Sequence, residues 1–160
     1  MIISRHYMDS DMLRFEVRKR DQLHEDVSGY LKLAGISTVT YTLMKKENLE
    51  VVGIVGLNVL WKGVAQVWLL TSDAARGCGV SYTKECIRLM DQEALRLSIR
   101  RIHIVVDAGI KENARWAKVL GFKYESSMKK AAPNGNDMNI YVYWPKGVNY
   151  GWRRTVSTAA

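Results

Sequence analysis

The sequence predicts one α+β domain of mixed α/β type, in which helices flank a central, mixed but mostly antiparallel sheet of about six to seven strands. Three observations predict this fold class. Three runs rich in β-branched and aromatic residues follow one another between residues 37 and 70, with only short turns between them. The hydrophobic period then changes to that of a long amphipathic helix. A strand, a shorter helix and a hairpin follow it.

The elements before the first long strand are short. The stretch MIISRHYM predicts a strand over residues 1–8, and SDMLRFEV and DQLHEDVSGYL predict helices over residues 10–17 and 21–31. Ser10 is expected to cap the first of these helices, because a serine oxygen accepts hydrogen bonds from the N–H groups of a helix start.

Three strands are expected next. STVTYTLM, LEVVGIVGLNVL and VAQVWLL span residues 37–44, 49–60 and 64–70. The segments KKEN and WKG, which separate them, have the length and composition of turns. Strands joined by turns this short pair antiparallel, so we expect three consecutive antiparallel strands.

A long amphipathic helix of about four turns is predicted from Ser81 onward. Its apolar side is expected to carry Thr83, Ile87, Met90, Ala94 and Leu97. The following stretch RIHIVVDAG is expected to lie parallel to the strand before the helix, because a helical crossover joins parallel strands.

The last elements are a helix and a hairpin. KENARWAKVLGF predicts a helix over residues 111–122, with Gly121 as its C-terminal cap. FKYESSM and MNIYVYW are expected to pair as antiparallel strands around the turn-forming stretch APNGND.

The composition is that of a folded globular domain, with 48% apolar and 25% charged residues. The formal net charge of +8 fits attraction to nucleic acid, to a membrane surface or to an acidic small molecule. The basic pairs are spread along the chain, so charge alone does not choose among these partners. We expect residues 1–147 to form a single domain and residues 148–160 to be a partly ordered C-terminal tail.

The cysteines and the apolar runs bear on the cellular compartment of the protein. Cys78 and Cys86 are the only cysteines and have no His or Cys partners at a metal-ligand spacing, so we expect reduced thiols and no zinc site. The first residues lack the apolar core of a signal peptide, and no run reaches the roughly 20 residues of a membrane span. A cytoplasmic protein with no membrane partner is therefore expected.

The stretch ARGCGVS at residues 75–81 is a glycine-rich bend directly before the long helix. A helix N-terminus has unpaired N–H groups and about half a positive charge, so it favours a phosphate. Gly77 and Gly79 would let the backbone approach that phosphate closely, and Arg76 could add a charge-assisted hydrogen bond. The alternative is a tight strand-to-helix turn that holds no ligand.

Two motifs give the chain a resemblance to the Gcn5-related N-acetyltransferase (GNAT) superfamily, from about Thr38 to Trp144. The first is ARGCGVS, which is similar to the family's arginine or glutamine followed by glycine, any residue and glycine. The second is ENARWAKVLGFKYES, which is similar to an asparagine-led helix ending in leucine, glycine and phenylalanine. The strand between the two motifs makes the resemblance more specific than a glycine bend alone.

The resemblance implies that the bend holds the pyrophosphate of acetyl-CoA or coenzyme A. It also implies that the strands holding Trp68 and Val105 separate, which leaves backbone groups free to pair with the pantetheine arm as though it were a strand. The expected cofactor-binding residues are Leu69, Leu70, Thr71, Arg76, Gly77, Cys78, Gly79, Val80, Ser81 and Asn113. Asn113 has an alternative role as a helix-start residue that satisfies nearby backbone groups. Trp68 is expected in the core rather than the acyl pocket.

The catalytic residues stay unassigned. Many relatives carry a glutamate base where this chain has Gln66, and a tyrosine acid where it has Ala117, and neither residue can transfer a proton at neutral pH. His103, Asp107 and Tyr124 are possible substitutes. A lone histidine on an alternating strand is nevertheless more often structural than a base. Cys78 is read as a residue chosen for its size rather than as a nucleophile.

Three classes of function remain open. The first is an acyl-CoA-dependent N-acyltransferase that acts on a protein or small-molecule amine. The second is a binding protein that keeps the fold and docks on another protein. The stretches NARWAKVLGF and PNGND resemble acetyltransferase-like proteins of short-tailed bacteriophages. This resemblance implies a phage protein that acts on a bacterial host protein in the host cytoplasm, or one that is packaged in the virion for delivery into the host. Nucleic-acid binding ranks last, because no stacking motif or basic arm is present.

Overall fold

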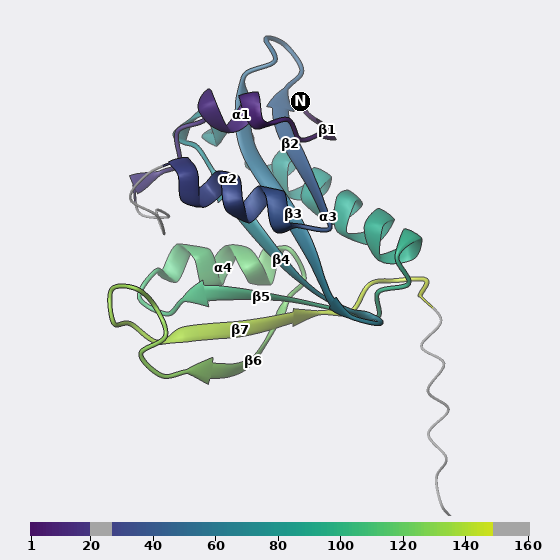
Figure 1. Cartoon of the computed structure of the whole chain (residues 1–160), viewed down its shortest axis with the longest axis vertical. Helices are drawn as coiled ribbons and strands as arrows, with labels where there is room; N and C mark the ends of the chain where they lie inside the picture. The colour runs from purple at the N-terminus through teal and green to yellow at the C-terminus, as the bar shows by residue number, and fades with distance from the viewer. Residues whose placement is uncertain (20–26, 149–160) are drawn as a thin grey trace, which may run out of the picture.

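The computed structural model describes residues 1–19 and 27–148. Its seven strands form one sheet in the order β1-β2-β3-β4-β5-β7-β6 (Figure 1). β4 and β5 are parallel and every other neighbouring pair is antiparallel, which confirms the expected mixed sheet. The strands are β1 (Ile2–His6), β2 (Val39–Lys45), β3 (Val51–Trp61), β4 (Val64–Thr71), β5 (Arg101–Asp107), β6 (Lys123–Met128) and β7 (Met138–Tyr143).

Helices cover both faces of the sheet. Figure 1 shows α1 and α2 on the near side of the strands and α3 behind them. The helices are α1 (Asp9–Leu13), α2 (Val27–Ile36), α3 (Gly79–Arg96) and α4 (Lys111–Val119), with a short 3-10 turn η2 (Asp73–Ala75) between β4 and α3. α4 joins α3 on the same face, because Trp116 Nε1 donates to Thr83 Oγ1 at 3.2 Å.

The first helix differs from the sequence prediction. α1 ends at Leu13, and Ser10 lies inside it, so the prediction that Ser10 caps the helix was wrong. Met8 is the N-cap residue, and its backbone N–H donates to the Asp11 carboxylate at 3.0 Å. Of the second predicted helix, residues 21–26 lie outside the described residues, and α2 continues to Ile36.

Two apolar cores lie on opposite faces of the sheet. The larger one packs α3 and α4 against the sheet, and the smaller one packs α1 and α2 against β3 and β4. Met90 and Ala94 of α3 are buried as expected, whereas Thr83, Ile87 and Leu97 are only partly buried. The fully buried side of α3 is rotated from the predicted one and consists of Tyr82, Cys86, Leu89, Met90, Glu93 and Ala94.

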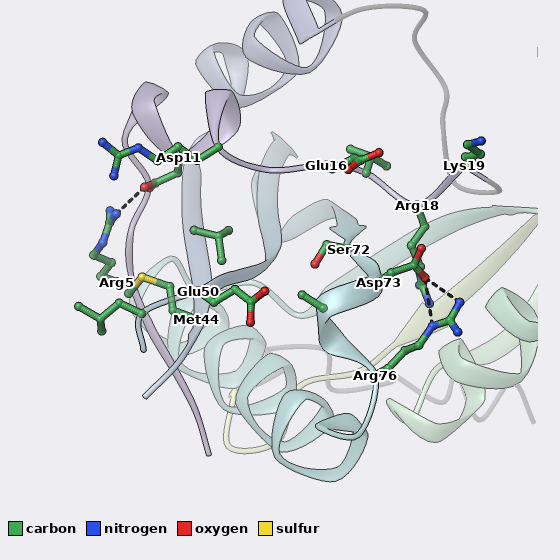
Figure 2. Close-up of a pocket in the computed structure, with 15 residues that line it drawn as sticks. Arg5, Asp11, Glu16, Arg18, Lys19, Met44, Glu50, Ser72, Asp73 and Arg76 are labelled. Carbon is green, nitrogen blue, oxygen red and sulfur yellow. Dashed lines mark hydrogen bonds and ion pairs between the residues drawn. The ribbon is translucent and has the colours of Figure 1, made fainter. Parts of the chain in front are cut away.

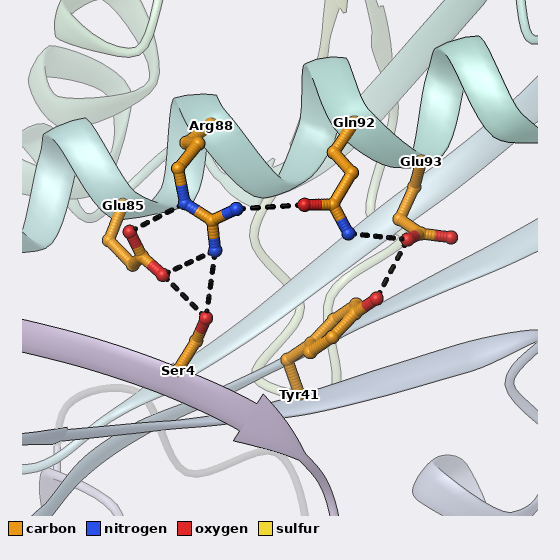
Figure 3. Close-up of polar contacts among 6 residues, drawn as sticks. All are labelled: Ser4, Tyr41, Glu85, Arg88, Gln92 and Glu93. Atoms are coloured by element: carbon orange, nitrogen blue, oxygen red, sulfur yellow. Dashed lines mark hydrogen bonds and ion pairs between the residues drawn. The ribbon is translucent and has the colours of Figure 1, made fainter.

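A chain of polar contacts joins α3 to strands β1 and β2 (Figure 3). Ser4 of β1 donates to Glu85, and Tyr41 of β2 donates to Glu93 at 2.7 Å. Burial alone would raise the pKa of the Glu93 carboxyl, but hydrogen bonds from Arg96, Tyr41 and Gln92 outweigh burial and hold that pKa below its ordinary value. Glu93 therefore stays charged although only 2% of it is exposed.

Asp11 is a second buried carboxylate, on the opposite face of the sheet. It accepts hydrogen bonds from Arg5 at 2.5 Å and from Thr42 at 2.7 Å, in addition to the Met8 N–H. Burial pushes the pKa of this carboxyl up, but these hydrogen bonds and the Arg5 charge together lower the pKa below its usual value. Asp11 thus ties α1 to β1 and β2 in its charged form.

We expect the protein to lose stability below about pH 4. Asp11 and Glu93 have lowered pKa values in the folded state, so their stabilisation is complete above the unfolded pKa and is lost as the pH falls through the folded pKa. Urea unfolding midpoints between pH 7 and pH 3 measure this loss. Asp11→Asn should flatten the dependence. A wild-type midpoint constant over this range would contradict the prediction.

Candidate functional site

The candidate site lies where the parallel strands β4 and β5 separate. Their pairing is limited to Val64 with Arg101, Ala65 with Ile102, and Gln66 with His103. β4 then continues to Thr71 and β5 to Asp107 without pairing with each other. The sequence prediction that these two strands separate is therefore confirmed. The open ends of both strands lie at one edge of the sheet, where α3 and α4 begin.

The glycine bend lies at this open edge. Gly77 has a φ of +80°, a left-handed conformation that favours glycine. Cys78 is the N-cap of α3, and the first helical hydrogen bond that follows the bend runs from the Tyr82 N–H to the Cys78 carbonyl. The N–H groups of Gly79, Val80 and Ser81 precede that bond at the positive end of an 18-residue helix.

The space around the bend is open. A Cβ atom built on Gly77 or Gly79 would meet no described atom within 4 Å, apart from the adjacent residues and the backbone of its own helix. The first turn of α3 carries no acidic side chain that would repel an anion. Arg76 is exposed, and its guanidinium contacts the Asp73 carboxylate at 3.1 Å. An exposed pair of this kind is worth little, so Arg76 can turn to an incoming phosphate at small cost.

The cofactor-binding residues predicted from the sequence lie around the open ends of β4 and β5. Leu69, Leu70 and Thr71 lie on the part of β4 that leaves β5, and the bend follows them directly. Asn113 lies in the first turn of α4, just beyond the open end of β5. The hydrogen bond from Trp116 to Thr83 brings the middle of α4 beside the first turns of α3, with the Trp116 and Tyr82 rings 5.8 Å apart.

Other residues considered as catalytic substitutes have structural roles. The Asp107 carboxylate accepts hydrogen bonds from the Gly109 N–H at 2.7 Å, from Asn134 at 2.7 Å and from Asn136 at 2.9 Å. These bonds outweigh burial and lower the pKa of Asp107, so this carboxylate holds the β6–β7 turn against the start of α4. Tyr124 is exposed on β6, an edge strand, and stacks edge-on against Tyr141.

Three more side chains named from the sequence lie in the core or near it. Ala117 lies on the buried side of α4, with 1% exposed. Burial raises the pKa of the Cys86 thiol, which leaves it unreactive. Trp68 packs on the smaller core, as expected, and its indole N–H donates to Ser37 Oγ at 2.8 Å.

A row of polar side chains crosses the sheet at the point of separation. Asn58 of β3 pairs with Gln66 of β4, which pairs with His103 of β5, so the three side chains share one face. All three are half-buried. Asn58 Oδ1 and His103 Nδ1 are buried without a hydrogen-bond partner among the described residues. Asn58 was not singled out from the sequence. It could have been noticed as the one amide side chain in an otherwise apolar strand.

A groove of about 1190 Å³ lies between the segment that follows α1 and the C-terminal end of β4 (Figure 2). The segment after α1 closes one side of it, where the Arg18 N–H donates to the Thr71 carbonyl at 3.0 Å. Cationic and acidic side chains both line the groove, among them Arg5, Arg14, Lys19, Glu16, Glu50 and Asp73. Arg76 lines it too, so the groove adjoins the glycine bend.

Comparison with solved structures identifies the architecture. A candidate phosphinothricin N-acetyltransferase superposes with a TM-score of 0.74 at 16% identity, over 91% of this chain and 99% of that one. This chain has the GNAT fold. Ard1 from Thermoplasma volcanium has a TM-score of 0.77 at 11% identity, over 90% and 97% of the two chains. The ribosomal-protein-S5-alanine acetyltransferase from Vibrio fischeri has a TM-score of 0.68 at 14% identity, over 92% and 95%.

The likeness to these N-acetyltransferases is one of structure. No family model and no curated protein matches the sequence. In the GNAT fold of this chain, no helix within residues 1–19 and 27–148 is long and apolar enough to cross a membrane. The same part of the chain holds no cluster of three or more His, Cys, Asp or Glu side chains placed to bind a metal ion.

Proposed function

We propose that the protein transfers an acyl group from acetyl-CoA, or a related acyl-CoA, to an amine. The observation that carries the proposal is the separation of β4 from β5 after Gln66 and His103, with the start of α3 at the open end. The gap presents a strand edge for an extended ligand, and the helix start presents donors for a pyrophosphate. The N-acetyltransferases that share the fold support this reading.

Each part of the acyl donor would meet different groups. The N–H groups of Gly79, Val80 and Ser81, with the Arg76 guanidinium, would bind the pyrophosphate. The edge of β4 at Leu69, Leu70 and Thr71 would pair with the pantetheine amides, and Asn113 would contact the same arm. The net charge of +8 would attract the anionic donor from solution. Bound there, acyl-CoA would supply a thioester, which is the activated acyl group that an amine needs.

Calorimetric titration with acetyl-CoA tests this proposal. We expect saturable binding and, with a panel of peptide and small-molecule amines, release of free coenzyme A detected by mass spectrometry. The same spectra would reveal self-acetylation of the chain. Absence of binding at millimolar acetyl-CoA would overturn the proposal, and the bend would then be a turn without a ligand.

A second candidate function is a GNAT-fold protein that binds acyl-CoA and docks on a bacterial host protein, as in the bacteriophage proteins that the sequence resembles. The observation that favours it is the lack of proton-transfer groups at Gln66 and at the buried Ala117. Binding of acetyl-CoA with no turnover for any amine, and no self-acetylation, would favour this second function. Both functions are expected in the cytoplasm.

A further inference from the structure

We propose that Asn58, Gln66 and His103 form a hydrogen-bonded row in which the Gln66 carboxamide orients the His103 imidazole, so that His103 Nε2 takes the proton that the acceptor amine loses. The inference rests on the proposed acyl transfer. It assigns the catalytic base to a strand residue, and it makes Gln66 a positioning residue rather than a vacant catalytic position.

The first argument is the position of the row. Gln66 and His103 are the last pair before β4 and β5 separate, so they close the inner end of the gap. The acyl group of a donor lying in that gap, with its phosphates at the start of α3, would be held at this inner end. The face that carries the row also carries Trp68 and Arg101, two residues away on either strand.

The second argument is hydrogen-bond satisfaction. A buried polar atom without a partner costs stability, and Asn58 Oδ1 and His103 Nδ1 are two such atoms. Gln66 lies between them, and side chains directly opposite on neighbouring strands are within reach of each other. Its carboxamide has one donating and one accepting end, so it can donate to Asn58 Oδ1 and accept from the His103 Nδ1–H together.

That arrangement determines the tautomer of His103. With the proton on Nδ1 engaged by Gln66, the lone pair of Nε2 is left to accept a proton. A glutamate at position 66 could accept from His103 but could not donate to Asn58 while ionised. The amide at position 66 is therefore the group that satisfies both neighbours.

Burial, together with the charge of Arg101, favours the neutral form of the His103 imidazole. Burial lowers the pKa of His103 and the nearby Arg101 lowers it further, while Glu125 opposes both. Arg101 is held by Glu125 through a bond of 2.8 Å, so this cation stays near the ring. On the same row, β7 contributes the apolar Val142 and β6 the exposed Lys123, while β4 and β3 contribute only the uncharged Gln66 and Asn58.

In the reaction, the amine nitrogen forms a bond to the thioester carbonyl carbon and the carbon–sulfur bond breaks. His103 Nε2 takes the proton from that nitrogen, and the resulting imidazolium passes a proton to the leaving thiolate. The products are an amide and the free thiol, and His103 returns to its neutral form. Gln66 and Asn58 exchange no protons in this step.

The kinetic test uses His103→Gln, with His6→Gln as the matched control. His6 is exposed and stacks on Tyr41 at the other end of the sheet, with ring centroids 4.8 Å apart. We expect His103→Gln to lower kcat about 100-fold with acetyl-CoA affinity unchanged, because general base catalysis contributes 10²–10⁴-fold. The control should keep wild-type rates. A His103→Gln enzyme with the wild-type kcat would overturn the inference while leaving acyl transfer standing.

The spectroscopic test needs no turnover. Nitrogen-15 NMR of the imidazoles in the free protein, with His103 assigned from the His103→Gln spectrum, reports which ring nitrogen carries the proton. We expect Nδ1–H in the wild type and a shift towards Nε2–H in Gln66→Met, which removes both amide bonds. Gln66→Glu should raise the pKa of His103, because a carboxylate beside the ring favours the imidazolium. The same tautomer in the wild type and in Gln66→Met would overturn the orienting role of Gln66. Failure to bind acetyl-CoA would instead overturn the proposed function on which the inference rests.

Discussion

Gly79→Glu is expected to weaken acetyl-CoA binding by at least about 100-fold while leaving the protein folded. The substitution places a carboxylate at the first position of α3, where the proposal places the pyrophosphate. Loss of one charge-assisted hydrogen bond costs about 1.5–3 kcal/mol, and repulsion between two anions adds to it, so about 3 kcal/mol or 100-fold is expected. Calorimetric titration of the variant with acetyl-CoA measures the change.

The free protein should tolerate the same substitution. No φ in the left-handed region is recorded at Gly79, and a Cβ atom built there meets nothing within 4 Å. An acidic side chain in the first turn also interacts favourably with the helix dipole, so the melting temperature should stay level or rise slightly. Gly79→Ala is the matched control and should bind acetyl-CoA within a few-fold of the wild type. A folded Gly79→Glu protein with full affinity would rule out the proposed pyrophosphate site.

The parts of the fold that depend on local signals could be predicted from the sequence. The glycine bend precedes α3 because Gly77 needs a left-handed φ of +80°, and Gly121 ends α4 with a φ of +93°. The parallel pairing of β4 and β5 follows from the helical crossover between them. The two glycine positions are encoded by a few adjacent residues, and the parallel pairing is encoded by the order of consecutive elements, so neither requires knowledge of distant side-chain contacts.

The parts of the fold that depend on contacts between distant residues could not be predicted from the sequence. Ser10 is a good capping residue, but Asp11 makes the capping contact because Arg5 and Thr42 also bind that carboxylate. A glutamate is ordinarily exposed, yet Glu93 is buried because Tyr41 donates a hydrogen bond to it across the core. Such partners lie far apart in the chain, and only the assembled sheet brings them together.

The polar row shows the same limit at the candidate site. His103 and Gln66 are visible in the sequence as single polar residues on apolar strands, which more often have structural roles. A catalytic role is indicated only by the pairing register, which places Asn58, Gln66 and His103 side by side. Two of their buried atoms then lack partners among the described residues. Pairing register is a long-range property, so no short motif could have carried this assignment.

Gly56→Ala is expected to destabilise the protein by about 2 kcal/mol, within the range measured for overpacked cores. Gly56 pairs with Trp68 across β3 and β4, and a Cβ atom there would lie 2.2 Å from Trp68 Cε2 and 2.4 Å from Nε1. The indole cannot move freely, because its N–H is bonded to Ser37. Thermal unfolding should show a melting temperature roughly 4–8 °C lower.

The strain should be specific to the indole, and a double-mutant cycle tests this. Trp68→Leu removes the atoms that the new methyl group would meet, so the cost of Gly56→Ala should largely disappear in that background. The smaller core also adjoins the candidate site, because Trp68 and Gln66 share one face of β4. Displacement of the indole should therefore perturb the His103 imidazole signals in Gly56→Ala. An additive cycle would show that the cost of Gly56→Ala does not come from contact with the indole, and would contradict the prediction.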